Sequence, residues 1–238
     1  MIEKEAWKNL ENEISTCRKC TRLVDWREAM ARAKKRAYLE DEYWGKGVPG
    51  FGDWNARILV LGLAPGAHGS NRTGRMFTGD SSGNFLYPAL FRAGFSDREF
   101  SLNREDQLIL TDLFISAVCR CAPPGNKPTP VEIESCRGYL ERELLLLPRP
   151  EGIIALGQIA FHEVLVRYKK SGLDVSGMKF GHGAFYDPGM DHPWLLASFH
   201  PSRQNTQTGR LTIEMFDHIW QTARELLNCI RKDAIFEQ

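Results

Sequence analysis

The stretch "RILVLGLAPGAHGSNRTGRMFTGDSSGNF" (57–85) decides the fold of this 238-residue chain. After Arg57 it begins with a continuous apolar run, which is typical of a strand covered on both faces of a sheet. A loop rich in polar residues follows, with glycines at 62, 66, 69, 74, 79 and 83. In open α/β sheets, ligands bind at the carboxyl ends of the strands. The stretch therefore predicts an α/β fold with a ligand site in residues 62–85.

The rest of the chain alternates apolar runs with helical patterns. Three further buried strands are predicted at 108–121, 151–157 and 192–201. Helices are predicted at 3–15, 24–42, 83–94, 130–147, 158–170 and 211–232, and Thr129 is the expected N-cap of the fourth. This alternation indicates a mostly parallel sheet between helices. We expect a single domain over 1–238 with three layers, a central four-stranded mostly parallel sheet and an N-terminal helical segment (1–56).

Composition narrows the class of protein. The fractions of hydrophobic residues (42%) and charged residues (26%) are ordinary for a soluble globular domain. The net charge of +1 predicts no overall basic field, although local basic patches are compatible with it. The first residues lack the apolar core of a signal peptide, and no apolar run approaches the roughly 20 residues that span a bilayer. We expect an intracellular, cytoplasmic protein without a membrane partner.

Four cysteines form two spaced pairs, Cys17 with Cys20 and Cys121 with Cys136. In a reducing compartment such cysteines favour a metal site or catalysis over disulfides. Four thiolates suit a tetrahedral Zn²⁺ or a cubane iron–sulfur cluster, and the wide spacing of the second pair favours the cluster. The alternative is buried thiols that act as small apolar groups, which for Cys121 and Cys136 taken alone is the favoured interpretation.

Two further cysteines lie outside these pairs. Cys119 lies two residues before Cys121 and would point to the same face of a regular strand, so it competes for the ligand position. Cys229, in the last predicted helix, is most simply a buried thiol.

Two loops carry candidate chemistry. Residues 198–212, "SFHPSRQNTQTGRLT", bring an imidazole, an amide, two arginines and several hydroxyls to the end of the fourth strand. His200 can hydrogen-bond a ligand there, or bond locally to the backbone. In the glycine-rich loop, Asp80 is the only carboxylate between Asp53 and Asp97, and its alternative role is a turn. Phe77, between glycines, can stack on a planar ligand.

Taken together, "GLAPGAHGSNRTGRMFTGD", "RCAPPGNKPTP" and "HPSRQNTQTGRLT" resemble the iron–sulfur uracil-DNA glycosylases, specifically the family 5 (type B) branch of archaea and thermophilic bacteria. The resemblance covers nearly the whole chain. It implies a monofunctional hydrolase that flips uracil, and other deaminated bases such as hypoxanthine and xanthine, out of DNA and leaves an abasic site. It also implies a structural [4Fe–4S] cluster bound by Cys17, Cys20, Cys121 and Cys136. We expect a monomer that works on the nucleoid.

The resemblance implies a role for each matching residue. The expected catalytic residues are Asp80, His200 and Asn205. The expected base-binding residues are Ala64, Gly66, Phe77, Asn126 and His200. The expected DNA contacts are Arg72, Arg75, Arg203, Arg210 and, as a wedge in the base stack, Leu211. Two departures stand out: Met76 replaces a common proline, and Leu63 with Ala64 replaces a polar residue that many related glycosylases carry.

Two other functions compete with this interpretation. A metal-dependent nucleotide hydrolase or transferase would use the glycine-rich loop on phosphate, but the loop lacks the P-loop lysine and a second carboxylate for Mg²⁺. A non-enzymatic iron–sulfur DNA-binding sensor would need no carboxylate in the loop. Asp80 and the concentration of unusual loops at strand ends favour an enzyme over the sensor.

Overall fold

The computed structural model of the chain describes residues 2–148, 150–189 and 191–236. Its centre is a sheet of four parallel strands, which lie in the order β3 (Leu113–Ala117), β2 (Ile58–Gly62), β4 (Gly152–Leu156) and β6 (Trp194–Ser198). All four strands lie within the predicted ranges. They are buried along their whole length, as the continuous apolar runs indicate.

The sheet has six strands, so the expectation of four is wrong at the two edges. β1 (Phe51–Gly52) pairs antiparallel with β3, and β5 (Phe185–Tyr186) pairs antiparallel with β6. Strands of two residues leave no periodicity in the sequence. At Gly52, with φ +146°, an added Cβ would lie 2.3 Å from the carbonyl oxygen of Leu113. A glycine there lets the edge strand approach the sheet closely.

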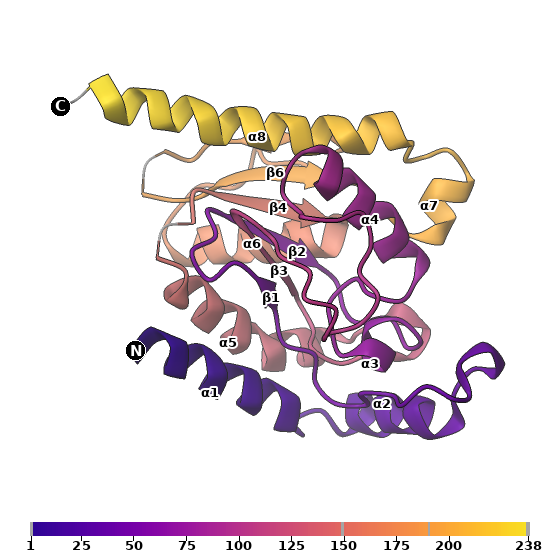
Figure 1. Cartoon of the computed structure of the whole chain (residues 1–238). Helices are drawn as coiled ribbons and strands as arrows, with labels where there is room; N and C mark the ends of the chain where they lie inside the picture. Colours follow the sequence, from indigo (N-terminus) through magenta and orange to yellow (C-terminus); the bar gives the residue numbers. More distant parts are fainter. Residues whose placement is uncertain (1, 149, 190, 237–238) are drawn as a thin grey trace.

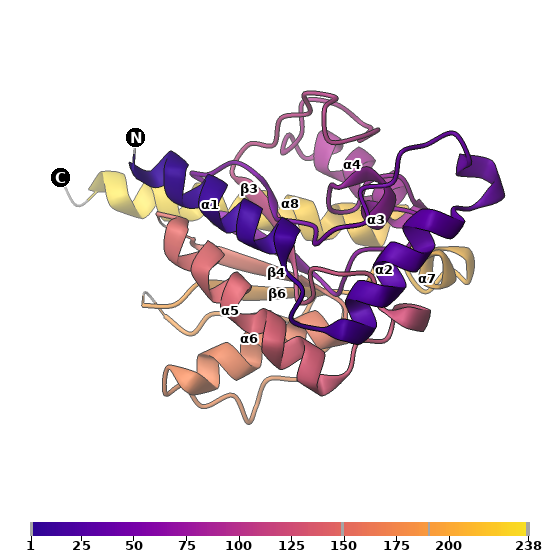
Figure 2. The same cartoon turned by 90° about the horizontal axis from the view of Figure 1, so that it is seen from below.

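Helices cover both faces of the sheet and make three layers (Figures 1 and 2). α4 (Ser81–Arg92) and α8 (Ile213–Phe236) pack on one face, and α1 (Ile2–Thr16), α5 (Pro130–Leu146) and α6 (Gln158–Lys170) pack on the other. Within β2, Ile58 and Val60 join the first core, whereas Leu59 and Leu61 join the second. This alternation is the period of two expected of a strand between two helical layers.

Five short or peripheral helices complete the part of the chain that the structure describes. They are α2 (Thr21–Ala33), η1 (Arg36–Tyr38), α3 (Ser70–Thr73), η2 (Pro124–Asn126) and α7 (Arg203–Gln207). The prediction of one helix over 24–42 is wrong, because α2 ends at Ala33. Lys34 follows with φ +50°, a conformation that cannot continue a right-handed helix.

The start of α5 follows the sequence prediction. Thr129 is the N-cap, and its side chain accepts a hydrogen bond from the Glu132 N–H while the Glu132 carboxylate accepts one from the Thr129 N–H. Near the other end of α5, Glu143 accepts hydrogen bonds from Arg120 at 2.9 and 2.6 Å and from Ser116 at 2.6 Å. Both ends of α5 are therefore fixed.

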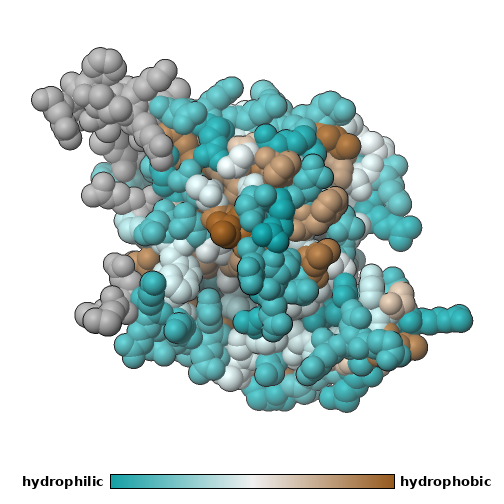
Figure 3. Space-filling model, in the orientation of Figure 1, coloured by the Kyte–Doolittle hydropathy of each residue, from teal (hydrophilic) through white to brown (hydrophobic). Residues whose placement is uncertain are grey.

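The outer surface is mostly hydrophilic in the view of Figure 3, where apolar side chains form scattered patches. Among the described residues, no helix is long and apolar enough to cross a membrane.

Candidate active site

A cavity of about 540 Å³ lies at the carboxyl ends of β2 and β3, next to the loop that follows β6. It brings together seven of the residues singled out in the sequence: Ala64, Gly66, Phe77, Asp80, Asn126, His200 and Arg203. They come from three segments that lie far apart along the chain. The position agrees with the rule that open α/β sheets bind ligands at strand ends.

Asp80 stands at the start of α4 as its N-cap. Its Oδ1 accepts hydrogen bonds from the N–H groups of Ser82 at 3.0 Å and Gly83 at 3.2 Å. Its Oδ2 lies against the loop backbone, because a Cβ added to Gly66 or Gly69 would stand 2.7 or 2.0 Å from it. Burial raises the pKa of Asp80, and the two N–H donors act in the opposite direction. The carboxylate is thus held in one position on the cavity wall.

The ring of Phe77 forms another part of the wall. It lies against the end of β2, where a Cβ added to Gly62 would stand 2.8 Å from the ring. Phe77 has a φ of +52° and is 8% exposed. The hydroxyl of Tyr87 donates to the Met76 carbonyl at 2.9 Å, which fixes the residue just before it. The ring is therefore a rigid apolar face.

His200 lies opposite, with its ring centroid 5.8 Å from that of Phe77 and an angle of 29° between the planes. Burial lowers the pKa of His200 to about 4, so the imidazole is neutral near pH 7. Asn205 does not line the cavity. Its Nδ2 donates to the His200 carbonyl at 2.9 Å, and its own carbonyl accepts from the Leu211 N–H at 3.0 Å. Asn205 therefore positions the loop that carries His200.

Two of the four arginines expected to bind phosphate are engaged inside the fold. The guanidinium of Arg72 pairs with Asp41 at 2.5 Å, and that of Arg75, which is 4% exposed, pairs with Asp106 at 2.5 Å. In this conformation the buried guanidinium of Arg75 is held by Asp106, and its contact with DNA stays a prediction. Arg210 is exposed and stacks on Phe199 at 4.6 Å. Arg203 is exposed at the cavity wall.

Leu211 is buried and does not line the cavity. It is 1% exposed and belongs to the core between the sheet and α8. The role of Leu211 as the wedge stays a prediction, and in this conformation the side chain is packed inside the protein. The same loop instead presents Gln204, which is exposed and lines the cavity. Sequence reasoning missed Gln204, since nothing in a polar run marks which side chain faces outward.

Sequence reasoning also missed the serines of the cavity. They are Ser70, Ser81, Ser82 and Ser202. A signal for two of them existed, because an Asp before a helical pattern is a common N-cap. Interpreting Asp80 as a cap would have placed the next two serines in the first turn of α4.

Four cysteines of the predicted ligand set gather between α1, α2 and the start of α5. All four are free, with Cys17 and Cys20 partly buried and Cys121 and Cys136 buried. Burial, followed by the charge of Cys136, raises the pKa of Cys20. Burial raises the pKa of Cys121 to about 12, with Cys136 and Cys17 acting in the same direction. Thiols that influence one another in this way are neighbours.

A set of four thiols is a donor set that both a tetrahedral Zn²⁺ and a cubane iron–sulfur cluster take. Among the residues that the structure describes, no three Cys, His, Asp or Glu side chains stand close enough to hold one metal ion. A single Zn²⁺ needs four donors at about 2.0–2.3 Å from one point. A cubane cluster instead takes each thiolate on a different iron atom.

Of the other two cysteines, the surroundings of Cys119 are described. Cys119 is buried in the core that lies under α1, α5 and α6, and its hydrogen bond to Cys136 raises its pKa. The side chain of Cys229 lies outside the described residues.

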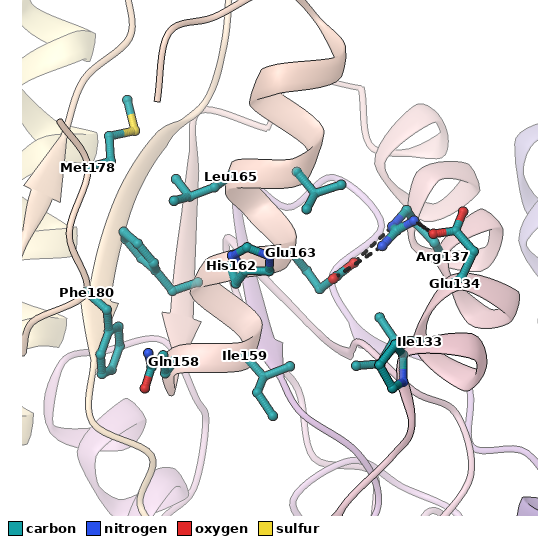
Figure 4. Close-up of a pocket in the computed structure, with 13 residues that line it drawn as sticks. Ile133, Glu134, Arg137, Gln158, Ile159, His162, Glu163, Leu165, Met178 and Phe180 are labelled. Atoms are coloured by element: carbon teal, nitrogen blue, oxygen red, sulfur yellow. Dashed lines mark hydrogen bonds and ion pairs between the residues drawn. The ribbon is translucent and has the colours of Figure 1, made fainter. Parts of the chain in front are cut away.

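A second cavity of about 630 Å³ lies beside α5 and α6, shown in Figure 4. Its two carboxylates, Glu134 and Glu163, both pair with Arg137, the latter at 2.9 Å. Most of the other lining residues are apolar, including Ile133 and Phe180. This cavity is therefore lined by fewer polar side chains than the first.

The chain is similar to known proteins over most of its length. The family model of the uracil DNA glycosylase superfamily matches residues 49–224. A type-5 uracil-DNA glycosylase of Thermus thermophilus is 53% identical over 214 residues, which cover 90% of this chain and 94% of that protein. One of Mycobacterium bovis is 47% identical and covers 90% and 79%, respectively. One of Pyrobaculum aerophilum is 39% identical over 219 residues, 92% of each chain.

Proposed function

Because the chain belongs to the uracil DNA glycosylase superfamily, in its type-5 branch, we propose that it hydrolyses the N-glycosidic bond of uracil in DNA and leaves an abasic site. The observation that carries the proposal is the meeting of Phe77, Asp80 and His200 in one cavity. The cavity volume of about 540 Å³ is within the usual range for small-molecule pockets. A base inside a duplex is out of reach, so the nucleotide must be extruded into this cavity.

Each wall of the cavity has a role in the cleavage. The Phe77 ring stacks on the extruded base, and Asn126 contacts its edge. As the glycosidic bond breaks, positive charge develops on the sugar and negative charge on the departing base. The neutral His200 and the backbone N–H groups around Ala64 and Gly66 stabilise the anionic base by hydrogen bonds.

Asp80 acts on the sugar side. Its carboxylate favours the cationic sugar and orients a water molecule for addition to C1′. The water supplies the hydroxyl of the abasic sugar, its proton passes to Asp80 or solvent, and the base anion takes up a proton on release.

The surface around the cavity holds the strand. Arg203 and Arg210 are exposed and contact phosphates in this proposal. We assign the filling of the gap in the base stack to Gln204, because it lines the cavity and is exposed, whereas Leu211 is buried. We propose action as a monomer, and the substrate places the enzyme at chromosomal DNA inside the cell.

The proposed cofactor is a [4Fe–4S] cluster on Cys17, Cys20, Cys121 and Cys136. When bound, it supplies no bond-breaking chemistry and joins the N-terminal helices to α5. Cys121 is the proposed ligand rather than Cys119, because the Cys121 thiol is influenced by Cys17, whereas the thiol influences on Cys119 come from Cys136 and Cys121.

The proposed substrates include hypoxanthine and xanthine. Rejection of a related base needs a polar group that is left unpaired when the wrong base binds. At the end of β2 the cavity is lined by Leu63 and Ala64, whose side chains offer no such group. This supports a broad choice of deaminated bases.

The test is incubation of purified protein with oligonucleotides that contain one uracil, without added metal. Strand breakage after alkali supports the glycosylase. Binding without breakage would indicate a sensor, and a requirement for free nucleotide and metal would indicate a hydrolase. Duplexes and single strands with hypoxanthine, xanthine or thymine define the range, with thymine as the negative control.

A further inference from the structure

Two arginines near the cysteines are buried almost completely, but the two guanidinium groups have different kinds of partner. Arg120 is 1% exposed and forms a bidentate pair with Glu143. Arg27, on α2, is 2% exposed and has no carboxylate within ion-pair distance among the residues that the structure describes. A guanidinium does not lose its proton in a protein, so Arg27 is a buried cation that needs an anion nearby.

The contacts of Arg27 show where that anion belongs. Its Nη1 donates to the Sγ of Cys121 at 2.9 Å, and its Nη2 donates to the Cys17 carbonyl at 2.9 Å. Its Nε is buried without a hydrogen-bond partner. Both partners belong to residues of the proposed ligand set. Four cluster-bound thiolates carry more negative charge than the iron–sulfide core offsets, so a loaded site is anionic.

The fold is shaped around this guanidinium. Gly47 passes beside it, and an added Cβ there would stand 2.0 Å from the Ile14 carbonyl oxygen and 3.4 Å from Arg27 Nη1. On the other side, the Arg27 carbonyl accepts a hydrogen bond from Nδ2 of Asn71 at 3.1 Å. The Asn71 N–H in turn donates to the carbonyl of Gly66, a residue of the base cavity, at 3.0 Å.

We propose that Arg27 is the counter-cation of the cysteine site, a positioning residue that hydrogen-bonds the ligating sulfur of Cys121. The backbone carbonyl of the same residue is linked through Asn71 to Gly66 in the loop that lines the base cavity. This inference rests on the proposed cluster and adds a residue that the cysteine motif does not contain.

The test uses the full-length, loaded protein with Arg27→Gln and Arg27→Lys. Arg32→Gln is the matched control, because Arg32 lies on the same helix and is exposed. Arg27→Gln is expected to lose iron to a chelator faster than the wild type, because removing a partner of a metal ligand usually lowers metal affinity about ten- to a hundredfold. Its reduction potential should become more negative, because a positive charge beside the cluster is lost. Arg27→Lys should keep the potential close to that of the wild type and lose iron at an intermediate rate.

The inference is overturned if Arg27→Gln matches Arg32→Gln in iron content, rate of iron loss and potential. If Arg27→Gln does not accumulate, Arg27→Lys decides, since wild-type iron retention in that variant would contradict the expected intermediate rate and the need for the guanidinium. A wild-type protein that contains no iron removes the inference even if it excises uracil. Conversely, an iron-loaded protein with the expected shifts supports it even if excision fails.

Discussion

Replacing Asp80 with Asn and with Ala separates two roles of one carboxylate. Oδ1 caps α4 by accepting hydrogen bonds from the N–H groups of Ser82 and Gly83, whereas Oδ2 lies toward the glycine-rich loop at the cavity. Asn is as good an N-cap as Asp, so Asp80→Asn keeps the cap and removes only the charge. Asp80→Ala removes both.

The two roles predict different magnitudes. Loss of the cap in Asp80→Ala should lower the free energy of unfolding by about 1 kcal/mol. For a chain of this size that lowers Tm by about 2–4 °C. Asp80→Asn should leave Tm almost unchanged. Loss of the charge should slow excision by about 10²–10³-fold in both variants, as removal of one preorganised electrostatic group does elsewhere.

The assay is single-turnover excision of uracil from a duplex oligonucleotide with enzyme in excess, together with Tm and binding of abasic product. Asp217→Asn is the control, because this carboxylate pairs with Arg92 away from the cavity. It should change neither rate nor product binding. Wild-type excision by Asp80→Asn would refute a role for the charge. A large rate loss in Asp80→Ala alone would show that the cap, and not the charge, matters.

Three other perturbations address the neighbouring groups. Gly69→Ala should displace the Asp80 carboxylate and slow single-turnover excision, because the new Cβ would stand 2.0 Å from Oδ2. Gly138→Ala is the control and should leave the rate unchanged, because its Cβ would meet nothing within 4 Å. Equal rates for the two variants would contradict the displacement of Asp80. Phe77→Leu should weaken binding of uracil-containing DNA by about 1–3 kcal/mol in fluorescence anisotropy, the usual contribution of base stacking, and unchanged affinity would exclude stacking. Burial lowers the pKa of His200 to about 4, below its unfolded value near 6.5. Its contribution to stability is therefore present above about pH 6.5 and is lost as the pH falls toward 4. Urea unfolding at pH 7 and pH 5 should show a smaller loss for His200→Gln than for the wild type, and equal losses would contradict the buried, neutral imidazole.

The four central strands and the Thr129 cap could be predicted because their signals are local. A buried parallel strand is a short apolar run, and an N-cap depends on residues three positions apart. β1 and β5 could not be predicted, since two paired residues have no pattern of their own. Their pairing depends on the strands beside which they lie.

The candidate site also contains residues whose positions could be predicted from the sequence and residues whose positions could not. Asp80 and His200 stand at the ends of elements, where the topology of the sheet alone brings them together. The sequence does not indicate the surroundings of residues that pack against distant parts of the chain. Arg75 looks free in the sequence and is neutralised by Asp106 from a later loop. Leu211 sits in a polar motif, yet the sheet and α8 bury it.

The left-handed backbone of Phe77 has a consequence for how the enzyme meets its substrate. A residue with a side chain at φ +52° holds a conformation about 1–2 kcal/mol above the preferred one, and only surrounding packing maintains it. The chain therefore meets this conformational penalty when it folds, before any DNA arrives. An incoming base finds a slot whose aromatic wall no longer has rotational freedom to lose. The ring is therefore ordered when the protein folds, and substrate binding does not have to order it again at each turnover.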